Sequence, residues 1–274
     1  MEIDMKDLVR RLFYVPKCAS CGVRLPVFVD KDELNHGLPC FCSKCVAEWH
    51  RVRTEMCQVC GKPADECSCM PKSKVFAQPT IPSLFFYRPD SNNVPSRAIY
   101  TLKHKRHADL IEFFALELSP KISELLCLLE LSADDCIFTY IPRTPAAIRK
   151  NGFDQGELLA KRLCAAVGGE RVLPLLTRKG GKEQKRLSRT ERRKNADSTI
   201  FANVRLRGVK RTDGKTSLED LLRRKPVVLI DDVITAGASV CRGVKLLKSH
   251  GAKCVIVASI ARCEVNRKTE KAKK

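Results

Sequence analysis

The chain of 274 residues contains no apolar run long enough to cross a membrane, and its N-terminus lacks the apolar region of a secretory signal. We therefore expect a cytoplasmic protein that does not insert into a membrane. Thiols stay reduced in that compartment, so the 15 cysteines are expected to bind metal or remain free rather than form disulfides.

The chain has far fewer acidic than basic side chains. There are 31 Asp and Glu against 51 Lys and Arg, which gives a formal net charge of +20. Such an excess favours polyanionic partners, either nucleic acid or phosphorylated small molecules. The charge alone does not choose between the two.

Apolar periodicity is also missing from the first part of the chain. Residues 1–70 hold nine of the 15 cysteines and cannot build a large core. We expect a small zinc-ribbon module there, followed by a proline-punctuated connector over residues 71–95 with short strands at 74–76 and 84–87. A larger domain is expected over residues 96–265, and a basic, disordered tail over 266–274.

Paired cysteines in the first module have the spacing of metal ligands. A C-x-x-C turn presents two thiolates from one tight loop, and tetrahedral Zn²⁺ takes four such ligands. Pairing in chain order predicts two structural sites, Cys18, Cys21, Cys42 and Cys45 for one ion and Cys57, Cys60, Cys67 and Cys69 for the other. Whether one or both sites bind zinc stays open, because the C-x-C pair is geometrically tighter than a C-x-x-C pair and Cys40 could compete as a ligand. A thioredoxin-like role is disfavoured because no βαβ pattern surrounds the pairs.

The rest of the chain alternates between helical and strand patterns. Helix is expected over residues 97–131 with an interruption near Pro120, and again after Asp154, an N-cap followed three residues later by Glu157. Strands are expected at 137–141, 172–176, 226–230 and 253–260. This alternation predicts an α/β fold with a parallel sheet flanked by helices. The remaining cysteines are expected to be small buried hydrophobes, namely Cys127, Cys136, Cys164, Cys241, Cys254 and Cys263.

The most informative segment is an acid pair after a buried strand. Asp231 and Asp232 follow Val227–Ile230, and a loop of small residues then opens into a helix expected over Val240–His250. Ligands bind beyond the carboxyl ends of parallel strands, and a helix N-terminus offers free N–H groups to an anion. The acids suit ribose hydroxyls or a hydrated Mg²⁺. The predicted phosphate cradle consists of Thr235, Ala236, Gly237, Ala238 and Ser239.

This segment is similar to the PRPP-binding motif of type I phosphoribosyltransferases. Further stretches extend the similarity, among them T-Y-I-P-R at 139–143, I-R-K-N-G-F-D-Q at 148–155 and I-Y-T-L-K-H at 99–104. With the cysteine module before them, nearly the whole chain resembles the ComF family of competence proteins. That family combines an N-terminal zinc ribbon with a type I phosphoribosyltransferase domain.

The resemblance implies roles for particular residues. Asp231 and Asp232 would contact the ribose of Mg²⁺–PRPP, residues 235–239 would hold its 5′-phosphate, and Arg143 would bind pyrophosphate. Residues 182–195 fall where type I enzymes carry a mobile loop. The chain departs from the pattern at Ala236, where a second Thr is common, and over residues 205–224, which form a longer connection without an assignable role.

Two basic segments admit more than one interpretation. Residues 178–194 could close over pyrophosphate, contact DNA phosphates or form a solvated charged loop. Residues 103–107 form a second cluster, which is also the pattern of a helix's polar face. The aromatic residues Trp49 and Phe153 are expected to pack rather than to stack on bases.

Three functional hypotheses follow. The leading one is a PRPP-binding phosphoribosyltransferase-like protein acting in DNA uptake and transformation, with a competence helicase or other uptake proteins as partners. The sequence reveals no acceptor and no general base. We do not expect an amidophosphoribosyltransferase, because Met1-Glu2 and the short zinc module do not supply the N-terminal cysteine nucleophile of its glutaminase domain. The alternatives are a non-catalytic adaptor that binds single-stranded DNA and a regulator that senses PRPP.

Overall fold

A five-stranded parallel sheet forms the centre of the molecule. The computed structural model describes residues 15–26, 40–54, 79–81, 83–87, 91–180, 189–204, 206 and 217–263. The strand order is β1-β7-β6-β2-β3, and each neighbouring pair is parallel. The strands are β1 (Phe85–Tyr87), β2 (Ile137–Tyr140), β3 (Arg171–Val172), β6 (Val227–Ile234) and β7 (Val255–Cys263). The predicted α/β class is therefore confirmed.

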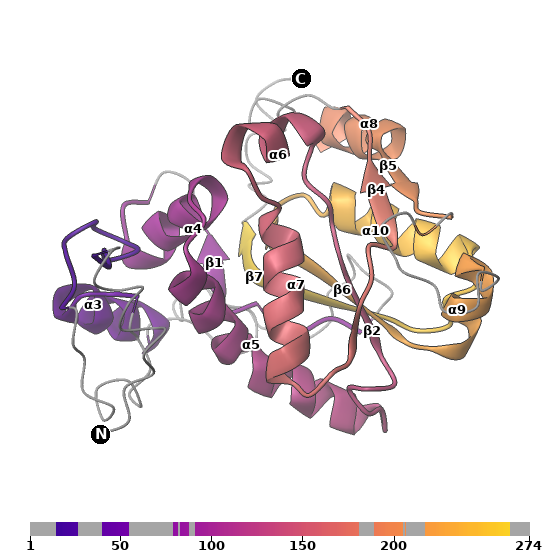
Figure 1. The fold of residues 1–274 in the computed structure, drawn as a ribbon, viewed down its shortest axis with the longest axis horizontal. Helices are drawn as coiled ribbons and strands as arrows, with labels where there is room; N and C mark the ends of the chain where they lie inside the picture. Colours follow the sequence, from indigo (N-terminus) through magenta and orange to yellow (C-terminus); the bar gives the residue numbers. More distant parts are fainter. Residues whose placement is uncertain are drawn as a thin grey trace, which may run out of the picture.

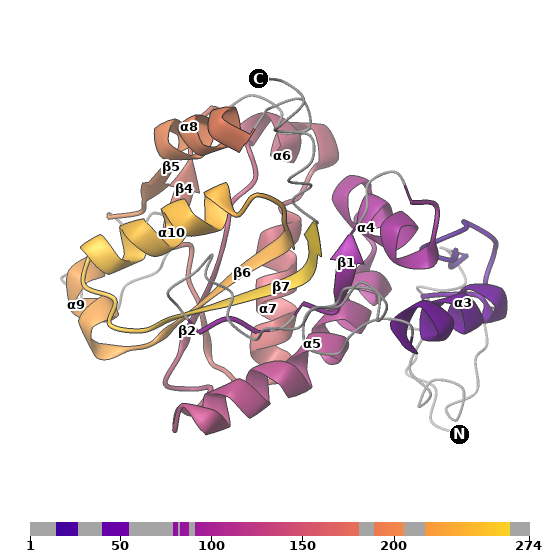
Figure 2. The same ribbon diagram turned by 180° about the vertical axis from the view of Figure 1, so that it is seen from behind.

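Helices cover both faces of this sheet. One face carries α5 (Ala108–Leu128) and α7 (Gln155–Ala166), and the other carries α9 (Leu218–Arg224) and α10 (Ala238–Ser249), as Figures 1 and 2 show from opposite sides. The sheet thus separates two apolar clusters. Strands buried on both faces explain the continuous apolar runs in β6 and β7.

The cysteine-rich segment packs onto the same core as the α5 face. Helix α3 (Ser43–Thr54) turns Trp49 toward Phe85 and Phe113, at ring-centroid distances of 5.7 and 5.0 Å. Trp49 is only 2% exposed, so its predicted packing role is confirmed. Helix α4 (Val94–His104) joins this segment to the sheet. The domain boundaries expected from the sequence stay predictions.

A small antiparallel ribbon lies apart from the main sheet. It pairs β4 (Leu176–Arg178) with β5 (Ile200–Ala202), and in Figure 1 it lies with α6 (Pro145–Asn151) and α8 (Arg189–Thr199) near the end of the sheet where α10 begins. The prediction of a single strand at 172–176 is therefore wrong, because β3 ends at Val172 and β4 begins at Leu176. Pro174 has no N–H to give to a ladder, and the chain turns between β3 and β4.

Two other expectations about helices and cysteines are corrected. Helix α5 continues through Pro120, and the break falls at residues 105–107 instead. Proline removes the N–H that would bond the carbonyl of Leu116, and the Ser119 hydroxyl donates to that carbonyl at 3.1 Å. Cys127 and Cys241 are exposed rather than buried, because they lie on the outer faces of α5 and α10.

Other expectations have a mixed outcome. The strand at 84–87 corresponds to β1, while that at 74–76 lies outside the described residues. Part of the 205–224 connection forms α9, whose Leu218 and Leu222 are fully buried beneath the sheet. Among the described residues no helix has both the length and the apolarity to cross a bilayer.

Candidate functional site

The acid pair lies at the point where the strand order of the sheet reverses. The chain leaves β2 toward β3 on one side and leaves β6 toward β7 on the other, so a crevice opens beyond the carboxyl ends of β2 and β6. Strand β2 pairs with β6 only as far as Ile230, whereas β7 pairs with β6 up to Ile234. Asp231 and Asp232 are therefore inside β6, not after it as predicted, but they lie beyond the end of β2.

The loop after β6 leads directly into α10. Gly237 adopts a left-handed conformation (φ 74°), and no side chain caps the helix. Helix α10 begins at Ala238 rather than at Val240, so Ala238 and Ser239 belong to its first turn. The N–H groups of a first turn have no partner within the helix, so they point toward any anion at this end.

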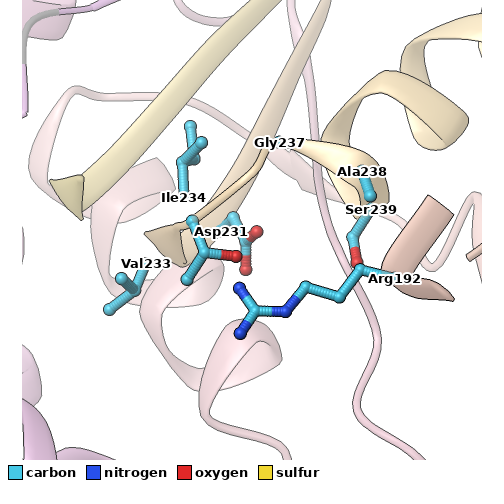
Figure 3. A pocket seen from close by; sticks show the side chains of 8 residues that line it. Arg192, Asp231, Val233, Ile234, Gly237, Ala238 and Ser239 are labelled. Carbon is cyan, nitrogen blue, oxygen red and sulfur yellow. The ribbon is translucent and has the colours of Figure 1, made fainter. Parts of the chain in front are cut away.

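A hollow is formed where Asp231, the loop after β6 and α8 meet. Its lining comprises Arg192, Asp231, Val233, Ile234, Thr235, Gly237, Ala238 and Ser239. Figure 3 shows the Arg192 guanidinium reaching from α8 toward the Asp231 carboxylate. The structure thus gathers most of the predicted phosphate cradle around one cavity. Among the predicted residues, Ala236, Asp232 and Arg143 are not part of its lining.

Asp232 is fixed by several contacts. Its Oδ1 accepts from the backbone N–H of Val233 at 2.7 Å, and its Oδ2 accepts from Gln155 Nε2 at 2.9 Å. The Lys103 ammonium lies 3.8 Å from the same Oδ2. Asp232 is 8% exposed, so these contacts determine where its carboxylate points.

Asp231 is the member of the pair whose charged form is disfavoured by its surroundings. Burial raises its pKa well above the ordinary value of 3.8, and the neighbouring Asp232 carboxylate raises it further. The charges of Lys103 and Arg178 act in the opposite direction. The arrangement therefore favours a bound group that donates hydrogen bonds or carries positive charge.

The G-F-D-Q segment supports this site from a neighbouring element. Gly152 ends α6 in a left-handed conformation (φ 78°), and Asp154 caps α7 through Gly156 N–H at 2.9 Å. The other Asp154 oxygen accepts from the backbone N–H of Arg143 at 2.8 Å. Asp154 as N-cap is confirmed, and Gln155 gives the segment its contact with the acid pair.

Arg143 lies on the loop that follows β2. Its Nη2 donates to the Lys103 carbonyl at 2.9 Å, and its guanidinium lies 5.8 Å from the centre of the Phe153 ring. Nη1 is buried without a hydrogen-bond partner among the described residues. Burial lowers the pKa of Arg143, opposed by the charges of Asp232 and Asp154. A buried cation with a free donor is suited to an anionic ligand.

Arg178 is a site residue that the sequence did not single out. From β4 it donates to the Pro142 carbonyl at 3.2 Å and to Ser239 Oγ at 3.4 Å, and so bridges the end of β2 and the first turn of α10. Its Nε is buried without a partner among the described residues. The only sequence signal was its place at the start of the basic run 178–194. Residues 181–188 of that run lie outside the described residues.

Lys103 was also missed, because it was read as part of a helix's polar face. Its ammonium lies 5.6 Å above the Tyr87 ring as well as near Asp232. Another residue of that cluster, His107, is the N-cap of α5. The resemblance of the 99–104 stretch to a known family was the signal that could have found it.

The first set of predicted metal ligands comes together in space. The Sγ atoms of Cys18, Cys21, Cys42 and Cys45 all lie within 4.8 Å of one another. Zn–S bonds of about 2.3 Å in a tetrahedron separate sulfurs by about 3.8 Å, and Cys21 and Cys42 are 3.7 Å apart. The residues therefore fit a tetrahedral metal ion. Cys40 is buried outside this set, and the second set, Cys57, Cys60, Cys67 and Cys69, lies outside the described residues.

The cluster holds thiols of very different acidity. Burial raises the pKa of Cys18, but hydrogen bonds from the backbone of Cys21, Cys42 and Ser20 outweigh it and bring the pKa to about 7. Burial raises the pKa of Cys45 to about 12. Four neighbouring thiols cannot all ionise alone, so a bound dication would supply the charge that makes them thiolates.

Comparison with known proteins finds a similarity over the C-terminal part of the chain. Residues 146–274 match the family model of the phosphoribosyl transferase domain. No curated protein matches the chain. Nineteen chains of solved structures match, among them one described as the structure of the allosteric regulatory enzyme of purine biosynthesis, with 19% identity and a TM-score of 0.32. That match covers 63% of this chain but only 28% of the other. The family-model match covers the part of the chain that contains β6, the loop after it and α10, and it makes this part similar to phosphoribosyl transferase domains.

Proposed function

We propose that this protein binds Mg²⁺–PRPP in the crevice beyond β2 and β6 and transfers its phosphoribosyl group with release of pyrophosphate. The observation that carries the proposal is that Asp231 and the start of α10 line one hollow, with Asp232 next to Asp231 on β6. One side can accept hydrogen bonds from ribose hydroxyls, and the other can donate to a phosphate. PRPP presents both groups on one molecule.

Each set of residues has a distinct task in this mechanism. Asp231 and Asp232 accept hydrogen bonds from the ribose hydroxyls, and the N–H groups of residues 235–239 donate to the 5′-phosphate. Arg143 Nη1 and Arg178 Nε, which are buried without a partner among the described residues, would donate to pyrophosphate. The acid pair would also hold Mg²⁺, which would supply positive charge against the pyrophosphate.

The reaction is a substitution at C1′ of the ribose. The bond from C1′ to the pyrophosphate oxygen breaks with its electron pair, and the acceptor nucleophile forms a new bond to C1′ with inversion. The positive charge that develops at C1′ is met by the acid pair, while the arginines stabilise the leaving group. Positioning and electrostatics supply the catalysis, without a covalent intermediate on the protein.

Calorimetric titration with Mg²⁺–PRPP tests the binding step. The wild type is expected to bind, and Asp231→Ala/Asp232→Ala is expected to weaken binding by more than about 100-fold, since two hydrogen bonds to charged groups are lost. Glu170→Gln serves as control, because this exposed residue lies outside the site. Absence of binding by the wild type would overturn the proposal. Pyrophosphate release against a panel of bases and nucleic acids then identifies the acceptor.

We infer the biological setting from the ComF resemblance. Under this proposal, the protein acts in DNA uptake and transformation together with a competence helicase or other uptake proteins, and the Cys18, Cys21, Cys42 and Cys45 cluster holds structural Zn²⁺. The net charge of +20 favours a second candidate, an adaptor that binds single-stranded DNA without catalysis. That candidate requires DNA affinity that falls steeply with salt. Absent or salt-independent DNA binding eliminates it.

A further inference from the structure

One helix connects the cysteine cluster to the acid pair. Helix α4 contacts Ser20, beside the cysteine cluster, through its first turn, and it contacts Asp232 through its last turn. We propose that the four-cysteine knuckle positions Lys103 at Asp232 through α4, and thereby sets the affinity of the site for PRPP. The inference rests on the proposed function for its ligand, and its structural part concerns only this chain's own contacts.

Arg97 anchors the first end of the helix. Its Nε donates to Ser20 Oγ at 2.7 Å, and Ser20 lies between the cluster residues Cys18 and Cys21. Its Nη2 forms a 3.2 Å ion pair with Glu48 of α3, and this pair is about 30% exposed on both sides (27% and 29%). A shielded pair with a fork-shaped donor holds geometry better than a surface pair does.

Glu48 also fixes the start of α4 directly. Its Oε1 accepts from the backbone N–H of Val94 at 2.8 Å, while its Oε2 accepts from Arg97. The carboxylate thus acts as an anion at the helix N-terminus, where it is favoured. Because Glu48 follows Cys45 on the same helix α3, displacement of the cysteine cluster would carry this anchor with it.

The other end of α4 delivers Lys103 to the site. Six residues beyond Arg97, or about 9 Å along a helix, the Lys103 ammonium lies 3.8 Å from Asp232 Oδ2 and 5.6 Å from the centre of the Tyr87 ring. The Lys103 carbonyl accepts from Arg143 Nη2 at 2.9 Å. The last turn of α4 therefore touches both the acid pair and the predicted pyrophosphate arginine.

The helix between these ends is packed tightly enough to transmit a displacement. Ala98, Ile99 and Leu102 are fully buried in the cluster that also contains Cys18 and Cys45. Close-packed interiors move as units rather than deform continuously. Arg97 is thus a positioning residue that acts through Lys103, whose ammonium lies 3.8 Å from Asp232 Oδ2.

A double-mutant cycle tests this connection through PRPP binding. Arg97→Met is expected to weaken Mg²⁺–PRPP binding about fivefold or more, the range of coupling free energies between linked sites. In a Lys103→Met background the same change is expected to have almost no effect, because the residue it positions is gone. Arg162→Met is the matched control, since Arg162 is exposed on α7 and pairs with Glu112 of α5 rather than with a residue of α3 or α4.

A second measurement needs no PRPP. NMR of Lys103 Nζ or Cε, assigned with Lys103→Met, reports whether the ammonium is paired with Asp232. The Arg97→Met variant is expected to shift this resonance toward that of Asp232→Asn, with zinc content and circular dichroism unchanged. Zinc removal by a chelator is expected to shift it in the same direction.

The outcomes separate the two proposals. A Lys103 resonance that Arg97→Met leaves unmoved overturns the inference, whether or not PRPP binds. Equal losses of PRPP affinity in both backgrounds overturn it as well. If Arg97→Met disturbs folding, the milder Ser20→Ala removes one contact of the same anchor and is read in the same way. A moved resonance in a wild type that does not bind PRPP supports the positioning role and rejects the proposed function.

Discussion

Asp231 shows how a single residue can serve function at the expense of stability. Its carboxylate is desolvated beside a second acid, and its pKa is raised well above 3.8 for that reason. An unfolded chain ionises this group more easily, so stability falls as pH rises from 3.8 through the folded-state pKa. Desolvation and a like-charged neighbour thus place an electrostatically unfavourable carboxyl group at the hollow, a pattern typical of functional sites.

Asp231→Asn is therefore expected to stabilise the protein at pH 7 and to abolish PRPP binding. The melting temperature should rise by about 2–4 °C for each kcal/mol recovered in a chain of this size. Below pH 3.8 the wild-type carboxyl is protonated in both states, so the advantage should vanish there. Thermal melts at pH 3 and pH 7 check this. Asp197→Asn on the exposed side of α8 is the control, and an equal gain at both pH values would contradict the explanation.

Residues close together in the sequence could be predicted, and residues brought together by folding could not. Asp231 and Ser239 stand in one short segment whose pattern indicates a ligand loop. Arg178 and Lys103 reach the same place from β4 and α4. In the sequence both lie in basic runs that are usually solvated, and only the packing of the sheet gives them another role.

Among the elements, α10 is the one that connects the site to the core. Its second turn lies against the sheet at Gly243, where an added Cβ would lie 3.0 Å from both Ile141 Cδ1 and Leu176 Cδ1 and 3.2 Å from Leu229 Cδ2. The missing side chain lets the helix approach the sheet, and that approach places its N-terminus beside the acid pair.

Gly243→Val is expected to destabilise the protein by about 1–3 kcal/mol through overpacking. Because the helix must move outward, PRPP binding should weaken as well, although the position lies outside the hollow. Urea denaturation and calorimetry measure the two effects. Lys245→Val, an exposed position on the same helix, controls for the helix propensity of valine. A loss of the same size in both variants would refute the packing argument.

At the level of elements, the sequence predicted strongly patterned segments and failed at their interruptions. The buried run of β6 and the capped start of α7 were both identifiable from local residues. The interruption predicted at Pro120 is wrong because the Ser119 hydroxyl donates to the carbonyl that the proline leaves without a donor. Apolar periodicity does not show such a side-chain contact. The continuation of β6 past Ile230 depends on the length of β7, which is a property of a neighbouring strand.

At the scale of the whole molecule, the cysteine knuckle and the sheet share one core. Cys18, Cys45 and Trp49 belong to the same buried cluster as Phe114 and Phe138. The composition of residues 1–70 predicted a separate small module. Cysteine spacing indicates metal ligands, but it does not show what the module packs against. The aromatic contacts of Trp49 make the connection.

Loss of the metal ligands is therefore expected to weaken the whole protein rather than one part. Cys45→Ser should remove one zinc equivalent and lower the melting temperature in a single transition, because the cluster's thiols and the sheet's apolar residues unfold together. Elemental analysis and calorimetric melts measure the two changes. Cys241→Ser, an exposed cysteine outside the cluster, should change neither. Two separate transitions in Cys45→Ser, with the second unmoved from the wild type, would show that the knuckle folds independently of the sheet.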